Sequence, residues 1–438
     1  MNTNVKLLGM TVMLSMTFAA CSNDELMERN HHDAPISFTT RVMTRATEIK
    51  LEHLHTFRVY ADAEGYNTMF IAGDTAKKSG TGNTFILQNS QDENYFWPSD
   101  VDKIRFWAYG PAGCDNKEDN IDIEPNITAS SQTFGDFTPK VNMNIGGQKH
   151  QDFVVAYTEA KRSETPGMAV KLEFKHALSQ IVMNATCGAG RKVSIKGAWL
   201  MNVYGSGKLT FDETKDANGF NGFKYKNCMR WEYKNETEPD NNKANYGVSL
   251  NDRVDLTQSV SNLINNTNSL MLIPQKTDIL GIDENSNVGN YKGAYILLLC
   301  RVEVEHSGAN HDGPIVPGEK HTHQLFPVNT DDKVNTIEYG YTCVPIALDW
   351  QPGVKYAYNL NFCGANSGAG IYPPDGVEDI KGLPTSNENL TIIERPGGKN
   401  PGDLVLDAPI TFDVTVGGWE PIDNEGNSGQ EDEDTPMS

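Results

Sequence analysis

Residues 170–187 read VKLEFKHALSQIVMNATC, and this stretch decides the fold class. Val170, Leu172 and Phe174 alternate with polar residues, which is the period of a β-strand with one buried face. The apolar positions resume in a different register after His176. We predict a strand, a kink and a second strand, and we interpret His176 as a buried structural histidine rather than a catalytic group.

Short runs of β-branched and aromatic residues recur on both sides of this stretch. Examples are HTFRVYAD (55–62), KIRFWAYGP (103–111), KVSIKGAWLMNVY (192–204), GAYILLLCRVEVE (293–305) and VKYAYNLNF (354–362). Clusters of Gly, Asn, Asp and Pro separate them, as turns do. No run longer than about 12 residues has helical periodicity, so we expect few and short helices. Many short strands without a βαβ rhythm predict β-sandwich domains.

The bulk composition limits the partners of the chain. It has 438 residues, 38% of them hydrophobic, and a formal net charge of −21. This length allows two or three domains, each with its own core. A nucleic-acid partner is not expected, because phosphate binding requires a clustered basic face and the chain has no block rich in Lys and Arg. We therefore predict an acidic protein exposed at a surface.

The N-terminus has the pattern of an export signal. The apolar run LLGMTVMLSMTFAA (7–20) follows Lys6 and is shorter than the roughly 20 residues that span a membrane. The following motif, FAAC (18–21), resembles the lipobox of bacterial lipoproteins, in which the cysteine is acylated, with palmitate for example. We predict lipidation of Cys21. The acidic SNDE (22–25) resembles a surface-export signal of some gram-negative lipoproteins; the alternative is a plain signal peptide with an incidental cysteine.

Six cysteines remain once Cys21 is set aside. An even number in an exported chain permits three disulfides, but six cysteines allow 15 pairings and the sequence selects none. No CxxC occurs, so neither a thioredoxin-like site nor a zinc ribbon is expected. We predict mostly free, buried thiols. The six are Cys114, Cys187, Cys228, Cys300, Cys343 and Cys363.

No catalytic or metal-binding constellation stands out in the sequence. There is no GxSxG, no P-loop and no HExxH. The segment DENSNVGN (283–290) has alternating Asp and Asn but lacks the glycine and glutamate positions of an EF-hand. A histidine group lies in what we interpret as a solvated polar loop: His306, His311, His321 and His323. We predict no enzyme, no cofactor and no metal site.

Five motifs together resemble the fimbrillin-like (Mfa-like) family, the pilins of type V pili of gram-negative bacteria. They occur in order between residues 18 and 419, and their order and spacing carry the resemblance. It implies an all-β chain of two tandem transthyretin-like β-sandwich domains. The motifs are FAAC (18–21), ISFTTRVMTRAT (36–47), KLEFKHALSQIVMNA (171–185), KYAYNLNF (355–362) and ITFDVTVGGW (410–419).

The same resemblance implies export as a lipoprotein, cleavage after an arginine and polymerisation by strand exchange. On this chain the cleaved bond is Arg45–Ala46, a basic–small pair; Arg41–Val42 and Arg29–Asn30 are alternatives. We therefore divide the chain into five parts. They are a lipoprotein signal (1–21), a propeptide with a displaceable strand (22–45), an N-terminal β-sandwich (46–165), a C-terminal β-sandwich (166–422) and an acidic disordered tail (423–438).

Strand exchange also has a physical logic that the residues supply. A strand holding Ile36, Phe38 and Val42 would cover a hydrophobic groove, and its removal would expose apolar surface and unpaired backbone groups. The candidate donor is the C-terminal run with Ile410, Phe412, Val414 and Val416 on one face. Alternatively, this run is simply the last strand of its own domain, and the protein is a tip, anchor or accessory subunit.

These interpretations predict a structural subunit of surface fimbriae that supports cell adhesion. Its location would be the cell outer membrane or the fimbrium. Its partners would be other fimbrial subunits, in a homo- or heteropolymer, and the outer membrane through the lipid anchor before processing. Two alternatives remain at this point: a monomeric or pilus-tip surface lipoprotein that binds glycans or host or bacterial ligands, and a hydrolase with a site built from loops.

Overall fold

The computed structural model describes most of the chain between residues 35 and 418. The described residues are 35–42, 54–80, 83–139, 151–164, 168–211, 229–233, 243–264, 269–277, 280, 293–307, 320–328, 338–387 and 389–418. Helical structure in these ranges is limited to two 3₁₀ turns, η2 (Lys117–Asp119) and η4 (Val377–Asp379). The all-β prediction is therefore confirmed. Over the same ranges, no helix has the length and apolarity needed to cross a bilayer.

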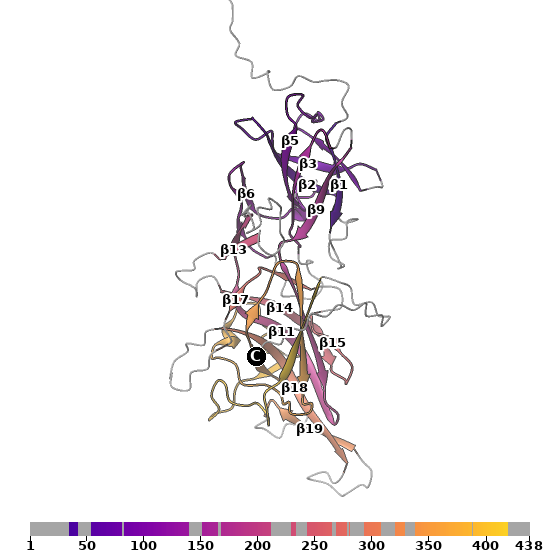
Figure 1. The fold of residues 1–438 in the computed structure, drawn as a ribbon. Helices are drawn as coiled ribbons and strands as arrows, with labels where there is room; N and C mark the ends of the chain where they lie inside the picture. Colours follow the sequence, from indigo (N-terminus) through magenta and orange to yellow (C-terminus); the bar gives the residue numbers. More distant parts are fainter. Residues whose placement is uncertain are drawn as a thin grey trace, which may run out of the picture.

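The N-terminal half forms a closed barrel, the upper part of Figure 1. Around the barrel the strand order is β1-β4-β3-β2-β5-β8-β9. Alternation builds its core: every second residue of β2, starting with Phe57, is buried. The ladder closes through β1 and β9, so the two-sheet sandwich expected for this half is not confirmed. The strands are β1 (Ser37–Val42), β2 (Thr56–Ala63), β3 (Ile71–Lys78), β4 (Thr84–Gln88), β5 (Lys103–Gly110), β8 (Val154–Lys161) and β9 (Val170–His176).

The C-terminal half consists of two sheets around one core, the lower part of Figure 1. One sheet has the order β15-β10-β22-β24, with β16 paired to β10; the other has the order β14-β11-β18-β20-β23, with β19 paired to β18. The first sheet comprises β10 (Ser179–Cys187), β15 (Ser261–Asn262), β16 (Leu270–Leu272), β22 (Val354–Phe362) and β24 (Thr411–Gly418). The second comprises β11 (Arg191–Tyr204), β14 (Lys243–Asp255), β18 (Ala294–Ser307), β19 (Lys320–Phe326), β20 (Glu338–Ile346) and β23 (Thr391–Ile393). A separate pair joins β17 (Lys276–Thr277) to β21 (Leu348–Asp349).

A third sheet lies between the barrel and the sandwich and draws strands from both halves of the chain (Figure 1). Its order is β13-β12-β7-β6. Its strands are β6 (Glu124–Ile127), β7 (Gln132–Phe137), β12 (Gly207–Phe211) and β13 (Met229–Tyr233). The predicted domain boundary between residues 165 and 166 precedes β9, which the pairing assigns to the barrel.

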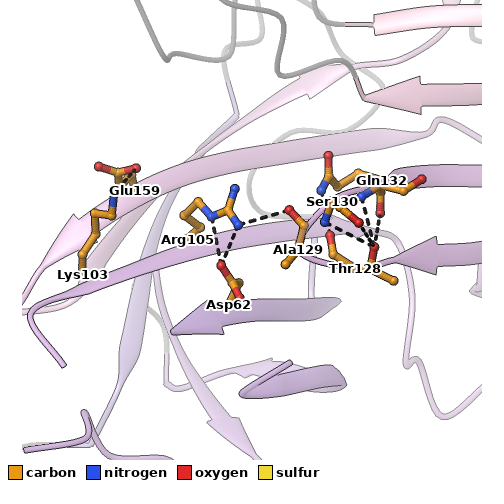
Figure 2. Close-up of polar contacts among 9 residues, drawn as sticks. Asp62, Lys103, Arg105, Thr128, Ala129, Ser130, Gln132 and Glu159 are labelled. Atoms are coloured by element: carbon orange, nitrogen blue, oxygen red, sulfur yellow. Dashed lines mark hydrogen bonds and ion pairs between the residues drawn. The ribbon is translucent and has the colours of Figure 1, made fainter. Parts of the chain in front are cut away.

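A cluster of polar contacts fastens the turn between β6 and β7 to the barrel wall (Figure 2). Arg105 on β5 forms an ion pair with Asp62 on β2, with Nη2 and Oδ2 2.6 Å apart. The same nitrogen donates a hydrogen bond to the carbonyl oxygen of Ala129 in the turn, at 3.1 Å. Arg105 also lies over the ring of Trp107, 5.2 Å from its centroid. One guanidinium therefore joins two barrel strands and the intermediate sheet.

Residues 170–187 connect the barrel to the sandwich. Strand β9 ends at His176 and β10 begins at Ser179, so the predicted strand, kink and strand are confirmed. His176 is buried, and its Nδ1 lies 2.6 Å from Oδ2 of the buried Asp152. The histidine is a structural group at the junction of the two halves, as expected. The chain between these strands comprises only residues 177 and 178.

Candidate functional site

Strand β1 closes the barrel because it pairs with both β4 and β9, which do not pair with each other. It runs antiparallel to β4, with Phe38 opposite Phe85, and parallel to β9, with Phe38 opposite Val170. At its start, the Ile36 N–H donates to the carbonyl oxygen of Tyr95 at 2.8 Å. Without β1, both β4 and β9 would present an unpaired edge, which is a template for another strand.

The inward side chains of β1 are part of the barrel core. Phe38 is fully buried and Ile36 nearly so. The Phe38 ring lies edge-on to Phe106 at 5.5 Å and to Phe57 at 6.2 Å between centroids. Burying one such side chain is worth about 1.5–3 kcal/mol. Loss of β1 would therefore open an apolar slot between β4 and β9.

One inward position of β1 is not apolar. Thr40 is buried, and its Oγ1 has no hydrogen-bond partner among the described residues. Its backbone is satisfied, since the Thr40 N–H donates to the carbonyl oxygen of Asn83 at 3.2 Å. A buried hydroxyl without a partner costs stability. Sequence patterning did not single out Thr40, because threonine is an ordinary strand residue and only burial reveals the cost.

Strand β24 lies at the edge of the five-stranded sheet and has opposite surroundings. Among the described residues its one strand partner is β22, in antiparallel register. Every residue from 411 to 417 is exposed. Phe412 and Val414 are each 37% exposed and Val416 is 57% exposed. These are large apolar side chains, so the strand leaves an uncovered apolar stripe.

The exposed stripe lies on the core-facing side of its own sheet. Phe412 lies opposite Leu360 and Val414 lies opposite Tyr358, and in an antiparallel pair opposite residues share a face. Leu360 and Tyr358 are buried in the sandwich core. The core-facing side of β24 therefore projects beyond the part of the sandwich that the opposing sheet covers.

Ile410, the first residue of the candidate donor run, differs from the other three. It is buried within the sandwich core, whereas Phe412, Val414 and Val416 are exposed. The segment before it is held as well, because the Gly368 N–H donates to the carbonyl oxygen of Pro409 at 2.8 Å. The candidate donor strand is thus anchored at its start and exposed along the rest of its length.

The candidate processing residues lie outside the described residues. These are Cys21, Arg45 and Ala46. Along the chain, Arg45 and Ala46 follow soon after Val42, the last residue of β1, and precede β2. Cleavage of this bond would break the covalent link between β1 and every other strand of the barrel. Lipidation of Cys21 and cleavage at Arg45–Ala46 therefore remain predictions.

The cysteines of the described residues are free thiols. They are Cys114, Cys187, Cys300, Cys343 and Cys363, whereas Cys228 lies outside the described residues. Burial raises the pKa of the Cys300 and Cys343 thiols far above the ordinary value, and it raises that of Cys363 to about 11. All five are free, and Cys187, Cys300 and Cys343 are buried, as predicted, whereas Cys114 and Cys363 are half-buried. The raised pKa values of Cys300, Cys343 and Cys363 make these three thiols poor nucleophiles at neutral pH.

The histidine group does not lie in a loop as expected. His306 belongs to β18, His321 and His323 belong to β19, and the backbone register pairs His306 with His321. His311 lies outside the described residues. The part of the chain that the structure describes contains no cluster of three or more His, Cys, Asp or Glu side chains arranged to hold a metal.

A small hollow of about 150 Å³ lies between β23 and the segment 372–378. Its wall includes the rings of Tyr341 and Tyr372, but these are only 7% and 3% exposed. Sugar-binding sites need a broad aromatic face for stacking, and these rings present almost none. At its rim, Arg395 is already paired with Asp375. The hollow therefore gives little support to the glycan-binding alternative.

Comparison with known proteins adds a family and several relatives. Residues 44–371 match the family model described as fimbrillin-like. A curated relative, "Fimbrium subunit Fim1C" of Phocaeicola vulgatus, is 27% identical over 192 residues, in an alignment that covers 39% of this chain and 48% of the relative. The chain thus matches about half the length of that relative.

Solved structures that align with this chain include a fimbrial protein from Bacteroides vulgatus. That protein is 15% identical, has a TM-score of 0.48, and aligns over 88% of this chain and 100% of its own. A protein from Parabacteroides distasonis classed with cell adhesion proteins is 9% identical, has a TM-score of 0.39, and aligns over 89% and 98%. The family match begins after β1 ends and stops before β24 begins, so it covers neither candidate strand.

Proposed function

Because this chain belongs to the fimbrillin-like family, we propose that it is a structural subunit of surface fimbriae of the type V kind. The subunit joins other fimbrial subunits by exchanging strands, and the resulting fibre supports cell adhesion. The family consists of fimbrial proteins and not of enzymes, which confirms that the chain is not an enzyme.

The observation that carries the proposal is the contrast between the first and last strands. Strand β1 fills a place with two strand partners and an apolar interior. Strand β24 has one strand partner among the described residues and an exposed apolar stripe. A chain with a removable strand at one end and an uncovered strand at the other can link to further subunits.

The energetics favour exchange once β1 has left. The slot between β4 and β9 would offer an incoming strand backbone partners on both sides. In its own sheet, β24 has a strand partner on one side, β22, among the described residues. Apolar side chains that are exposed on β24 would become buried in the slot, at roughly 25 cal/mol per Å². Departure of β1 would also open the barrel between β4 and β9.

The maturation route that we propose has two steps. The chain is exported with Cys21 acylated, which anchors it to the outer membrane. Cleavage at Arg45–Ala46 then removes the lipid, the propeptide and β1 together. The mature subunit is located in the fimbrium at the cell surface. On this route the lipid anchors the chain to the membrane only until assembly begins.

The test is the N-terminal residue of the protein extracted from the cell surface. We expect Ala46 in the wild-type protein and no polymer in an Arg45→Ala variant that is folded and lipidated. Arg41→Ala and Arg29→Ala are matched controls and should assemble normally. Normal fibre assembly by Arg45→Ala, or a mature wild-type protein that retains acylated Cys21, would contradict the proposal.

A further inference from the structure

The two ends of the described chain carry nearly the same sequence. Residues 33–42 read DAPISFTTRV and residues 407–416 read DAPITFDVTV. Six of the ten positions are identical, namely Asp, Ala, Pro, Ile, Phe and the final Val. A seventh position exchanges Ser for Thr. The first segment leads into and includes β1 in the barrel, and the second leads into and includes most of β24 in the sandwich.

We propose that β24 of a second copy of this chain takes the place of β1 in the same register. Position 36 then receives Ile410, which leaves the sandwich core of its own chain for this place. Position 38 receives Phe412, position 40 receives Val414 and position 42 receives Val416. This inference rests on the strand exchange proposed above. It adds the identity of the partner, which is the chain itself, and the register of the new ladder.

The inward face supports this register because it repeats the side chains that the barrel is shaped to hold. Phe38 fits among Phe57 and Phe106, and Phe412 would bring the same ring to the same backbone position. Ile410 would likewise replace Ile36 with an identical side chain. A shift by one residue would turn the polar face of the strand inward, so the pattern tolerates no such slip.

At the third inward position, the incoming β24 fits the slot better than β1 does. Thr40 buries a hydroxyl that has no partner among the described residues. Val414 has almost the same shape, with a methyl group in place of that hydroxyl. Removing a buried polar atom that lacks a partner is favourable. The exchange therefore improves the packing of the slot at one defined position.

The outward face supplies a complementary charge. In the β1–β9 register, Thr39 lies opposite Lys171, whose ammonium now pairs with Glu173 at 2.7 Å. Asp413 would occupy the position of Thr39 and lie opposite Lys171. Opposite charges directly across a ladder are favourable, and this pair forms in the same register as the inward matches.

The geometry also gives the assembly a direction. The donor strand belongs to the sandwich and the acceptor slot belongs to the barrel, which lie at different ends of the molecule (Figure 1). A contact between two different surfaces of identical subunits does not close on itself unless a rotation brings it into a ring. Each added copy therefore presents a new β24, and the chain acts as a repeating stalk subunit.

Disulfide trapping in the full chain tests the partner and the register. A recognition site for a sequence-specific protease replaces residues 43–46, so that release of β1 does not depend on the natural processing site. Thr39 lies opposite Thr84 in the barrel, so Asp413 should lie opposite residue 84 after exchange. The test variant carries Thr84→Cys and Asp413→Cys. The chain with only its native cysteines measures background.

We expect a ladder of disulfide-linked multimers after cleavage and none before it. Matched controls pair Thr84→Cys with Thr411→Cys or Thr415→Cys, which report a slip of two residues in either direction. Preferential linkage through 411 or 415, or an 84–413 disulfide within one chain, would overturn the inference while strand exchange stands. Complete cleavage without any multimer, linked or unlinked, would instead contradict strand exchange itself.

Discussion

Strands β1 and β24 have similar sequences and opposite environments. Phe38 in β1 is fully buried, whereas Phe412 at the equivalent place in β24 is 37% exposed. The difference arises from the neighbours: β1 lies between two strands, whereas β24 ends a sheet and its apolar side chains are left exposed. The residues of a strand therefore define which site it fits, and the topology decides whether it already occupies that site. The following predictions alter one member of this comparison at a time.

The largest difference is expected between Phe38→Ala and Phe412→Ala in the unprocessed monomer. Phe38→Ala removes a ring from the centre of the barrel and should lower the free energy of unfolding by about 3–5 kcal/mol. Phe412→Ala should lower it by about 1 kcal/mol or less, because the ring is already partly exposed. Urea unfolding, with hydrogen exchange of the barrel amides, measures both. Equal losses would show that β24 is buried in the monomer.

The next effect concerns the buried hydroxyl. Thr40→Val should raise the free energy of unfolding of the barrel by about 1 kcal/mol, because a polar atom without a partner among the described residues is replaced by a methyl group. It should also slow exchange after cleavage, since β1 then leaves a better-packed site. Val414→Thr is the reciprocal control and should weaken the multimer without changing the monomer. A destabilised Thr40→Val barrel would mean that the hydroxyl has a partner.

A smaller effect is expected at high pH beside β24. Tyr356 lies opposite Val416, and burial raises the pKa of its phenol to about 12. The folded sandwich therefore favours the neutral phenol. Its contribution is fully present below pH 10, the ordinary value, and is lost as the pH rises towards 12.

Urea unfolding of the sandwich at about pH 9 and about pH 11.5 tests this titration, with the window taken from the linkage of pKa to stability. The decrease in stability between the two values should be smaller in Tyr356→Phe than in the wild type. The phenylalanine variant keeps the ring and removes only the titrating group. An equal decrease in both proteins would show that folding does not raise the pKa of Tyr356.

The smallest effect is expected on the outward face. Lys171→Glu would place a third carboxylate beside those of Glu173 and Asp413. The repulsion should weaken the multimer by about 0.2–1 kcal/mol. Adding Asp413→Lys should restore the loss. Both effects should diminish in high salt, because exposed charges are screened. Sedimentation of the cleaved protein at two salt concentrations measures them; a loss that the second change leaves intact would exclude the cross-strand pair.

Part of this architecture follows from sequence alone. The alternation of Val170, Leu172 and Phe174 identifies β9, and the shift after His176 identifies the turn into β10, because both signals are local. Closure of the barrel does not follow, since it depends on pairing between Phe38 and Val170, which are far apart in the chain. Periodicity reports which face of a strand is apolar and carries no information on its neighbours.

The candidate site shows the same limit. Alternation identifies Phe412, Val414 and Val416 as one face of a strand, but it cannot reveal that this face is uncovered. The sequence predicts a loop where β18 and β19 pair, because Gly, Asn and Pro are frequent among the residues between these strands. Comparing residues 33–42 with 407–416 would have linked the two ends of the chain from the sequence, and it would have drawn attention to Thr40 and Asp413.

The intermediate sheet has a consequence for a fibre under tension. The barrel and the sandwich are connected covalently through residues 177 and 178, and a second time through the β7–β12 ladder, with Leu209 opposite Phe134. Arg105 ties the neighbouring turn to the barrel wall. A pull along the molecule is therefore shared between a peptide link and a row of hydrogen bonds. In the proposed fibre, these two connections would resist rotation of the barrel against the sandwich.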